Sequence, residues 1–337
     1  MQNQNYKFCP RAQYVSAPVV IDGFSRSGKF LLAHIIGSLN GLEAMQSPLL
    51  METALYLTRL GKLDLDTAKI MVQTDIDMNT YNMAIGRGLN YRIEDASCIY
   101  KTLDFGRFIA RTTVNDPDVL LEEFKRKNLL PLFIGHECLC NISTVLYIFP
   151  KIQLVNLQRD PVALITSWYR RGWGKRWGVD PKSASIGFSS PSGSPAPWFA
   201  VDWDPEYSLM GEMDRCVKSI ETLSNFAKDA YELLTEEQKS RIHFVSFGDI
   251  LSNPSNVISG ISNYLGRLPH QEIASVLARE RVPRVIPEGE RANLIFDIKE
   301  KISNEMLPIL DGLICEFDGY WMDLVQKSSL KSSAVNL

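Results

Sequence analysis

A chain of 337 residues can bury a substantial core, and this length favours a single α/β domain with insertions over residues 1–337. Its 36 basic and 39 acidic side chains give a net charge of −3, which leaves no broad basic surface for nucleic acid or an anionic membrane. Scattered cysteines and the lack of any run of ~20 apolar residues predict a cytoplasmic protein with reduced thiols and no membrane span.

The N-terminal part of the sequence predicts a strand, a Gly-rich loop and a helix. Residues 17–23 form a short, apolar, β-branched run that is typical of a buried parallel strand. From Gly28 apolar residues recur at helical spacing, and Gly41 closes the segment. This arrangement places free backbone N–H groups at a helix N-terminus, where they bind an anion. Residues 51–92 are predicted to be mainly helical and show no recognisable site.

Farther along the chain, predicted helices and strands alternate. Strands are expected at 131–135, 152–157 and 242–247, and helices at 116–127, 141–148, 162–171, 209–234 and 254–265, with a helical C-terminal part at about 270–326. This alternation predicts a doubly wound α/β fold, in which helices flank a central parallel β-sheet as in P-loop nucleotide kinases.

One long segment, about residues 173–205, is rich in Gly, Pro, Ser and Trp. A segment of this length without periodicity is typical of a lid or an acceptor-binding insertion. Its tryptophans could stack on a sugar or aromatic acceptor, or they could pack against the domain; they are Trp173, Trp177, Trp198 and Trp203.

The loop of residues 23–30, GFSRSGKF, is nearly a P-loop. A P-loop reads G-x-x-x-x-G-K-[ST], and its last hydroxyl holds the Mg²⁺ that bridges the phosphates. Phe30 occupies that last position here. The loop therefore suggests a phosphorylated ligand that is bound without a metal ion.

A second segment adds a cation at the end of a strand. Arg159 follows the strand predicted at 152–157, and Ser167 lies within the next helix. Ligands bind outside the carboxyl ends of the strands in an open α/β sheet, so Arg159 is well placed to bind one. A guanidinium offers a rigid fork of donors to a phosphate, and a hydroxyl adds a neutral donor.

These two segments resemble the sulfotransferases that use 3′-phosphoadenosine 5′-phosphosulfate. The first loop of that family commonly reads P-[KR]-S-G-T-T-x-L. Residues 25–32 keep its Arg-Ser-Gly and end in a Leu pair, the second Leu of which matches the motif. The second family motif, R-[DN]-P-x(5)-S, fits the sequence from Arg159 to Ser167 at every defined position. Residues 244–266 look like the family's Y-E-D-L-x-x-N-P segment followed by a helix that ends in Leu-Gly.

The resemblance implies a donor site and a catalytic cation. The donor-binding residues would be Ser25, Arg26, Ser27, Gly28, Lys29, Phe30, Arg159 and Ser167. Backbone N–H groups of residues 27–30 would hold the 5′-phosphosulfate, and Arg159 and Ser167 the 3′-phosphate. Arg26 stands where the family places the cation that stabilises the leaving nucleotide. Because Lys29 and Phe30 replace the Thr pair, either Arg26 or Lys29 could be the main catalytic cation; Arg26 is favoured, with Lys29 assisting.

The acceptor's proton requires a base. In the cytosolic branch of the family a His after a strand has this role, and His136 has the comparable place here. In the tyrosylprotein and heparan branches the base is a Glu after the first helix, a region that here contains Glu43 and Glu52. His136 is therefore the first candidate, and Glu137 and Glu52 are the alternatives.

Two other functions stay open at this point. The Gly28-Lys29 pair is compatible with a Mg²⁺-dependent P-loop kinase for a small molecule, and the altered Thr pair with a catalytically silent nucleotide-binding protein of the same fold. The motifs do not specify the acceptor, for which a carbohydrate or a small aromatic molecule is a candidate, nor do they predict the oligomeric state.

Overall fold

The computed structural model describes residues 7–9, 11–177, 180, 186–189, 193 and 195–333. Five parallel strands form its central sheet in the order β2-β3-β1-β4-β7. They are β1 (Val19–Asp22), β2 (Leu42–Gln46), β3 (Leu130–Ile134), β4 (Gln153–Gln158) and β7 (Ile242–Ser246). The predicted α/β class, with a central parallel sheet between helices, is confirmed.

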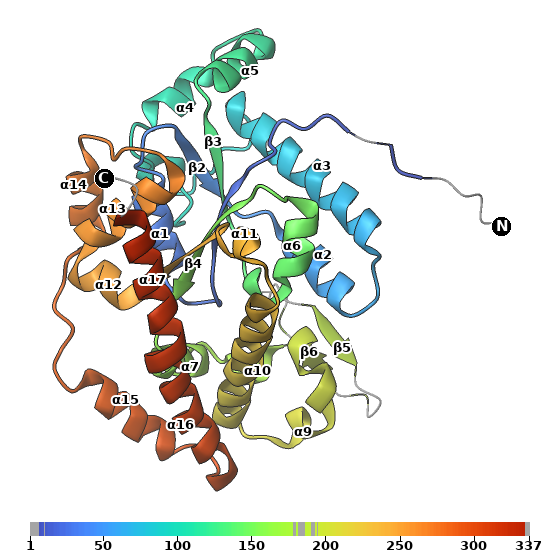
Figure 1. Cartoon of the computed structure of the whole chain (residues 1–337), viewed down its shortest axis with the longest axis vertical. Helices are drawn as coiled ribbons and strands as arrows, with labels where there is room; N and C mark the ends of the chain where they lie inside the picture. Colours follow the sequence, from blue (N-terminus) through green and yellow to red (C-terminus); the bar gives the residue numbers. More distant parts are fainter. Residues whose placement is uncertain are drawn as a thin grey trace.

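Helices cover both faces of the sheet (Figure 1). One face packs against α1 (Lys29–Ile36), α12 (Phe247–Ser252), α13 (Pro254–Leu265) and α14 (Ile273–Arg279). The other packs against α2 (Leu49–Arg59), α3 (Leu65–Ala84), α6 (Ile142–Ile148), α7 (Pro161–Arg170), α10 (Glu212–Glu232), α15 (Glu290–Lys299), α16 (Leu307–Glu316) and α17 (Met322–Ser333). In β1, Val19 and Ile21 belong to the first core and Val20 to the second, because successive side chains point to opposite faces.

The register of the strands aligns their carboxyl ends. Ile21 pairs with Ile134 of β3 and with Val155 of β4, and Gln158 of β4 pairs with Ser246 of β7. The residues that follow these strands therefore meet at one edge of the sheet. Figure 1 shows α7, α15 and α16 gathered beyond this end of β4.

Strand β2 was not predicted. The predicted first helix continues to Gly41, but α1 ends at Ile36, and β2 begins directly after Gly41. Glu43 interrupts the apolar pattern of β2, yet it is buried because Arg111 pairs with it, with 2.5 Å between Nη1 and Oε2. Its partner lies far along the chain, so no local sequence signal indicated a buried strand here. Helix α12 was also missed.

The predicted lid or insertion at 173–205 lies partly outside the described residues, and its described residues form short helices and strands. It contains α8 (Trp173–Arg176), a short antiparallel pair of β5 (Gly187–Ser189) and β6 (Pro195–Pro197), a 3₁₀ turn (Trp198–Trp203) and the start of α9 (Asp204–Leu209). Among the described residues, the remaining α-helices are α4 (Gly106–Arg111), α5 (Pro117–Arg126) and α11 (Glu236–Lys239). Across the described part of the chain, no helix has both the length and the apolar character needed to cross a membrane.

Candidate active site

The Gly-rich loop joins β1 to α1 at the carboxyl edge of the sheet. Two of its positions require glycine. Gly28 has φ 106°, and a Cβ there would lie 2.4 Å from the Phe247 ring; Gly23 has φ 142°, and a Cβ there would lie 2.6 Å from the Leu157 carbonyl oxygen. Arg26 is a non-glycine residue at φ 72°. Such conformations cost free energy and are held by surrounding contacts, which places strain at this loop.

The segment from Arg159 to Trp168 holds this loop in place. Arg159 Nη1 donates to the Arg26 carbonyl oxygen at 2.5 Å, and Trp168 Nε1 donates to the Ser25 carbonyl oxygen at 2.8 Å. Arg26 Nε donates to Ser167 Oγ at 3.4 Å. The structure thus brings together residues of the two predicted motifs. Trp168, which joins them, was not among the predicted site residues.

Cations are concentrated around the loop. Partial burial of the guanidinium lowers the pKa of Arg26, and nearby Arg171 lowers it further. Burial, followed by Arg26 and Arg284, likewise lowers the pKa of Arg159, although Asp160 and Glu290 oppose the shift. Arg171 thus repels Arg26, and Arg26 and Arg284 repel Arg159. An anion bound among them would remove this repulsion.

Two buried donors at the loop have no hydrogen-bond partner among the described residues. They are Arg159 Nε and Ser27 Oγ. Buried polar atoms are normally paired, and an unpaired donor costs free energy until a ligand or water satisfies it. These two atoms suit an oxyanion, which only accepts hydrogen bonds.

A cavity of about 630 Å³ adjoins Arg159. It is lined by residues that follow β4, by the end of β7 and the start of α12, and by α15 and the residues before it. These include Phe247, Arg284 and Glu290. The Arg159 guanidinium carbon lies 4.7 Å from the centre of the Phe247 ring. A volume of this size accommodates a nucleotide-sized ligand. Phe247 and Arg284 were not predicted as site residues; Phe247, which directly follows β7, could have been recognised by the same strand-end argument as Arg159.

Lys29 is turned into the loop. Its side chain is buried, and Nζ donates to the carbonyl oxygens of Gly23 at 2.5 Å and of Phe24 at 3.0 Å. Burial lowers the pKa of Lys29, although nearby Glu137, Asp22 and Glu52 oppose that shift. The ammonium group therefore braces the loop from inside. Arg26 and Phe30, in contrast, are exposed.

The candidate bases occupy different environments. His136 follows β3, and its Nδ1 lies 2.5 Å from Oε1 of Glu52 in the first turn of α2. Glu137 is buried at φ 54° and accepts a hydrogen bond from the Tyr56 hydroxyl at 2.5 Å. Glu43 is engaged by Arg111 and lies within β2. His136 and Glu52, two separate candidates in the sequence, form one pair in the fold.

The tryptophans of the 173–205 segment pack mainly on each other and on the domain. Trp177, Trp198 and Trp203 are buried. Trp198 stacks on Tyr56 with ring centres 4.5 Å apart, and Trp173 contacts Trp177 at 5.1 Å. Of the two roles considered for these rings, the structure favours packing.

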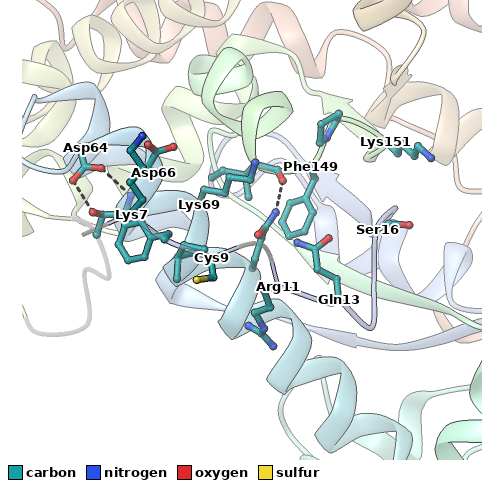
Figure 2. Close-up of a pocket in the computed structure, with 16 residues that line it drawn as sticks. Lys7, Cys9, Arg11, Gln13, Ser16, Asp64, Asp66, Lys69, Phe149 and Lys151 are labelled. Carbon is teal, nitrogen blue, oxygen red and sulfur yellow. Dashed lines mark hydrogen bonds between the residues drawn. The ribbon is translucent and has the colours of Figure 1, made fainter. Parts of the chain in front are cut away.

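A larger cavity, of about 1070 Å³, lies at the other edge of the sheet (Figure 2). Ser16 precedes β1 and Lys151 precedes β4, so this cavity lies at the amino ends of the strands. Arg11 and Asp64 line it from the N-terminal segment and from the start of α3. None of the predicted site residues lines this cavity, so the volume beside Arg159 is the better candidate site.

Comparisons with known proteins identify a family. A family model described as "Sulfotransferase domain" matches residues 18–281. Similar solved structures include the sulfotransferase domain from the curacin biosynthetic pathway, at 13% identity, with 96% of this chain and 99% of that chain covered and a TM-score of 0.42. The sulfotransferase domain from the Synechococcus PCC 7002 olefin synthase is similar at 14% identity, 97% and 96% coverage and a TM-score of 0.41. A search of curated proteins gave no significant match.

Proposed function

The chain belongs to the sulfotransferase domain family, whose model covers most of it, and we propose that it transfers the sulfuryl group of 3′-phosphoadenosine 5′-phosphosulfate to an acceptor hydroxyl or amine. The observation that supports this donor best is the meeting of Arg26, Arg159 and Ser167 at the Gly-rich loop. The unpaired donors Arg159 Nε and Ser27 Oγ add a demand for an oxyanion at the same place.

In this proposal, the two ends of the nucleotide are held by different elements. Backbone N–H groups of residues 27–30, at the start of α1, hold the 5′-phosphosulfate. Arg159 and Ser167 hold the 3′-phosphate, and the 630 Å³ cavity beside Phe247 receives the adenosine. The position where a P-loop carries its metal-binding hydroxyl is Phe30, so the loop binds the donor through N–H groups and cations.

The donor supplies the sulfuryl group when bound, and the protein's residues handle charge and the proton. Arg26 stabilises the charge that develops on the leaving phosphate, because a positioned cation lowers the barrier where charge appears. His136 takes the proton from the acceptor hydroxyl or amine. Lys29 keeps the loop in shape through the Gly23 and Phe24 carbonyl groups. The acceptor is a carbohydrate or a small aromatic molecule in this proposal.

Binding of the spent donor tests this function. Adenosine 3′,5′-bisphosphate should raise the melting temperature of the full chain more than adenosine 5′-monophosphate does, because only the former offers a 3′-phosphate to Arg159. Saturation at 100 times Kd corresponds to about 2.7 kcal/mol of added stability. Stabilisation by Mg²⁺-ATP and none by the bisphosphate would instead favour the kinase.

Transfer itself needs a second assay. Donor labelled with ³⁵S should label one or more compounds in a panel of sugars, phenols and amines. Binding of the bisphosphate without any labelled product would favour a catalytically silent protein of this fold.

A further inference from the structure

The pair of His136 and Glu52 is the most unusual contact at the candidate active site. Glu52 Oε1 lies 2.5 Å from His136 Nδ1, which leaves Nε2 as the ring nitrogen available to a substrate. The Glu52 side chain is 8% exposed and the His136 side chain 25% exposed. The histidine is thus the more accessible member, and the carboxyl group lies behind it.

The other polar groups around the pair are already engaged. Asp22 of β1 accepts from the backbone N–H groups of Cys138 and Leu139 and from Asn156 Nδ2, at 2.8 to 2.9 Å. Lys29 of α1 donates to two carbonyl oxygens of the loop. Those groups therefore contribute charge to the pair and leave its hydrogen bond intact.

Two further titratable side chains, Tyr56 and Cys138, lie near the pair. Tyr56 of α2 donates to Glu137, which follows His136 in the chain. The buried Cys138 thiol has a pKa raised by burial, so it stays neutral. A proton can therefore move between Glu52 and His136 without either neighbour ionising or breaking a hydrogen bond.

The environment determines where the proton lies. Burial raises the pKa of Glu52 to about 8, with Lys29 opposing the shift. Burial, with Lys29 adding to it, lowers the pKa of His136 to about 4. Near neutral pH these shifts favour a protonated Glu52 and a neutral His136 ring, which places the proton between Oε1 and Nδ1 on the carboxyl group.

This proton decides which ring nitrogen can act as a base. When Glu52 is protonated it donates to Nδ1, the hydrogen of the neutral ring is on Nε2, and Nε2 cannot accept a proton. When Glu52 is ionised it accepts from Nδ1–H, and Nε2 presents a lone pair. The carboxyl group thus sets the tautomer of the ring.

We propose that Glu52 is the positioning residue that sets the tautomer of His136 and receives its Nδ1 proton during the reaction. This inference rests on the proposed sulfotransferase function. The acceptor oxygen forms a bond to sulfur as the bond from sulfur to the leaving phosphate oxygen breaks. The acceptor's proton passes to Nε2 of His136, and the Nδ1 proton passes to Glu52. The ring stays neutral throughout, and a proton is later lost to solvent from Nε2 or the carboxyl group.

Histidine NMR tests the proposal without an acceptor. The full chain, labelled with ¹⁵N in its four histidines, should show the His136 ring passing from the Nε2–H to the Nδ1–H tautomer as pH rises from 6 to 10, with a midpoint near 8. His136→Asn identifies the signals. A tautomer that stays constant over this range would overturn the proposal.

Two substitutions separate the role of Glu52 from general changes in the cluster. Glu52→Gln cannot ionise, so the transition near pH 8 should disappear. Glu137→Gln removes a carboxyl group from the same cluster but can still accept from Tyr56, so the transition should remain. Melting temperatures verify that both variants fold. If Glu52→Gln kept the transition, or if Glu137→Gln abolished it, the proposal would be wrong.

The outcomes separate this inference from the function on which it rests. If the wild type did not bind the bisphosphate, the sulfotransferase proposal would be wrong, even if the tautomer transition were observed. Bisphosphate binding with a constant His136 tautomer would end only the role of Glu52. With an acceptor in hand, the rate should rise with pH through about 8 in the wild type, and this limb should be absent in Glu52→Gln.

Discussion

The guanidinium of Arg159 donates to the backbone carbonyl group of Arg26, with 2.5 Å between Nη1 and the oxygen. A side chain at the end of β4 thus fixes the loop that follows β1. The same guanidinium leaves Nε buried without a partner among the described residues. One residue therefore holds the loop in place and has a second, unpaired donor, which the proposed function assigns to the nucleotide.

Arg159→Ala should weaken binding of adenosine 3′,5′-bisphosphate by about 10- to 100-fold, the effect of losing a hydrogen bond to a charged group. Arg159→Lys keeps the charge but loses the fork of donors, so it should restore only part of the affinity. Titration calorimetry measures both. Arg170→Ala, an exposed arginine on the same segment, is the matched control and should bind as the wild type does. Equal affinity for all four proteins would show that Arg159 does not contact the nucleotide.

Lys29 is predicted to stabilise the fold. Lys29→Met leaves the buried carbonyl oxygens of Gly23 and Phe24 without their donor, and each such loss costs about 1–3 kcal/mol. The free energy of unfolding, measured in urea, should fall accordingly. Unchanged stability in Lys29→Met would mean that the ammonium group does not brace the loop.

Arg26 is predicted to act in turnover. Its side chain is exposed, so Arg26→Ala should change the free energy of unfolding by no more than about 0.5 kcal/mol. Turnover, measured with an acceptor found in the panel, should fall by about 100-fold or more, because a cation at the leaving group acts mainly in the transition state. Donor affinity should change less than kcat. The reverse order, with affinity falling more than kcat, would assign Arg26 to ground-state binding.

The parts of this site that the sequence could predict are those carried by short, contiguous patterns. The loop at 23–30 and the element from Arg159 to Ser167 each combine a strand end, a turn and a helix start, so their places at one edge follow from topology. The order of these motifs along the chain, which matches the order in the family, further supported the prediction. The structure then placed the two motifs in direct contact.

The parts that could not be predicted depend on partners that are distant in the sequence. Glu52 and His136 come from different elements, and their pairing requires α2 to lie beside the end of β3. Glu43 is a charged residue within β2, and its burial depends on the pairing with Arg111, which lies far along the chain. The inward turn of Lys29 likewise depends on how the loop closes over its ammonium group. A local pattern contains no information about such contacts.

Gly28 is predicted to be irreplaceable for steric reasons. Gly28→Ala would combine strain at φ 106° with a Cβ placed 2.4 Å from the ring of Phe247, so it should cost more than the roughly 1–2 kcal/mol of left-handed strain alone. Gly61→Ala is the control, because Gly61 has φ 65° and a Cβ added there would have no neighbouring atom within 4 Å among the described residues. The part of the Gly28→Ala cost that exceeds the strain cost should come from the clash with Phe247. In a double-mutant cycle, Phe247→Ala should therefore remove that part. If Gly28→Ala and Gly61→Ala lowered the free energy of unfolding equally, the Phe247 ring would be able to move aside without cost.

Acid sensitivity should arise in part from His243. This residue of β7 is buried, and its ring stacks on Tyr264 with centres 5.0 Å apart. Burial lowers the pKa of His243 to about 4, below the ordinary value of 6.5. The unfolded chain therefore binds more protons between these two values, and the contribution of His243 to stability is lost as pH falls from 6.5 to 4.

His243→Phe keeps an aromatic ring against Tyr264 and removes the titration. Unfolding in urea at pH 7.5 and at pH 4.5 gives the loss of stability on acidification for each protein. That loss should be smaller in the variant by about 2 kcal/mol, from the linkage between pKa and stability. Other acid-sensitive groups, such as His136, are common to both proteins and cancel in the comparison. The same loss in both proteins would mean that His243 does not stay neutral in the folded state.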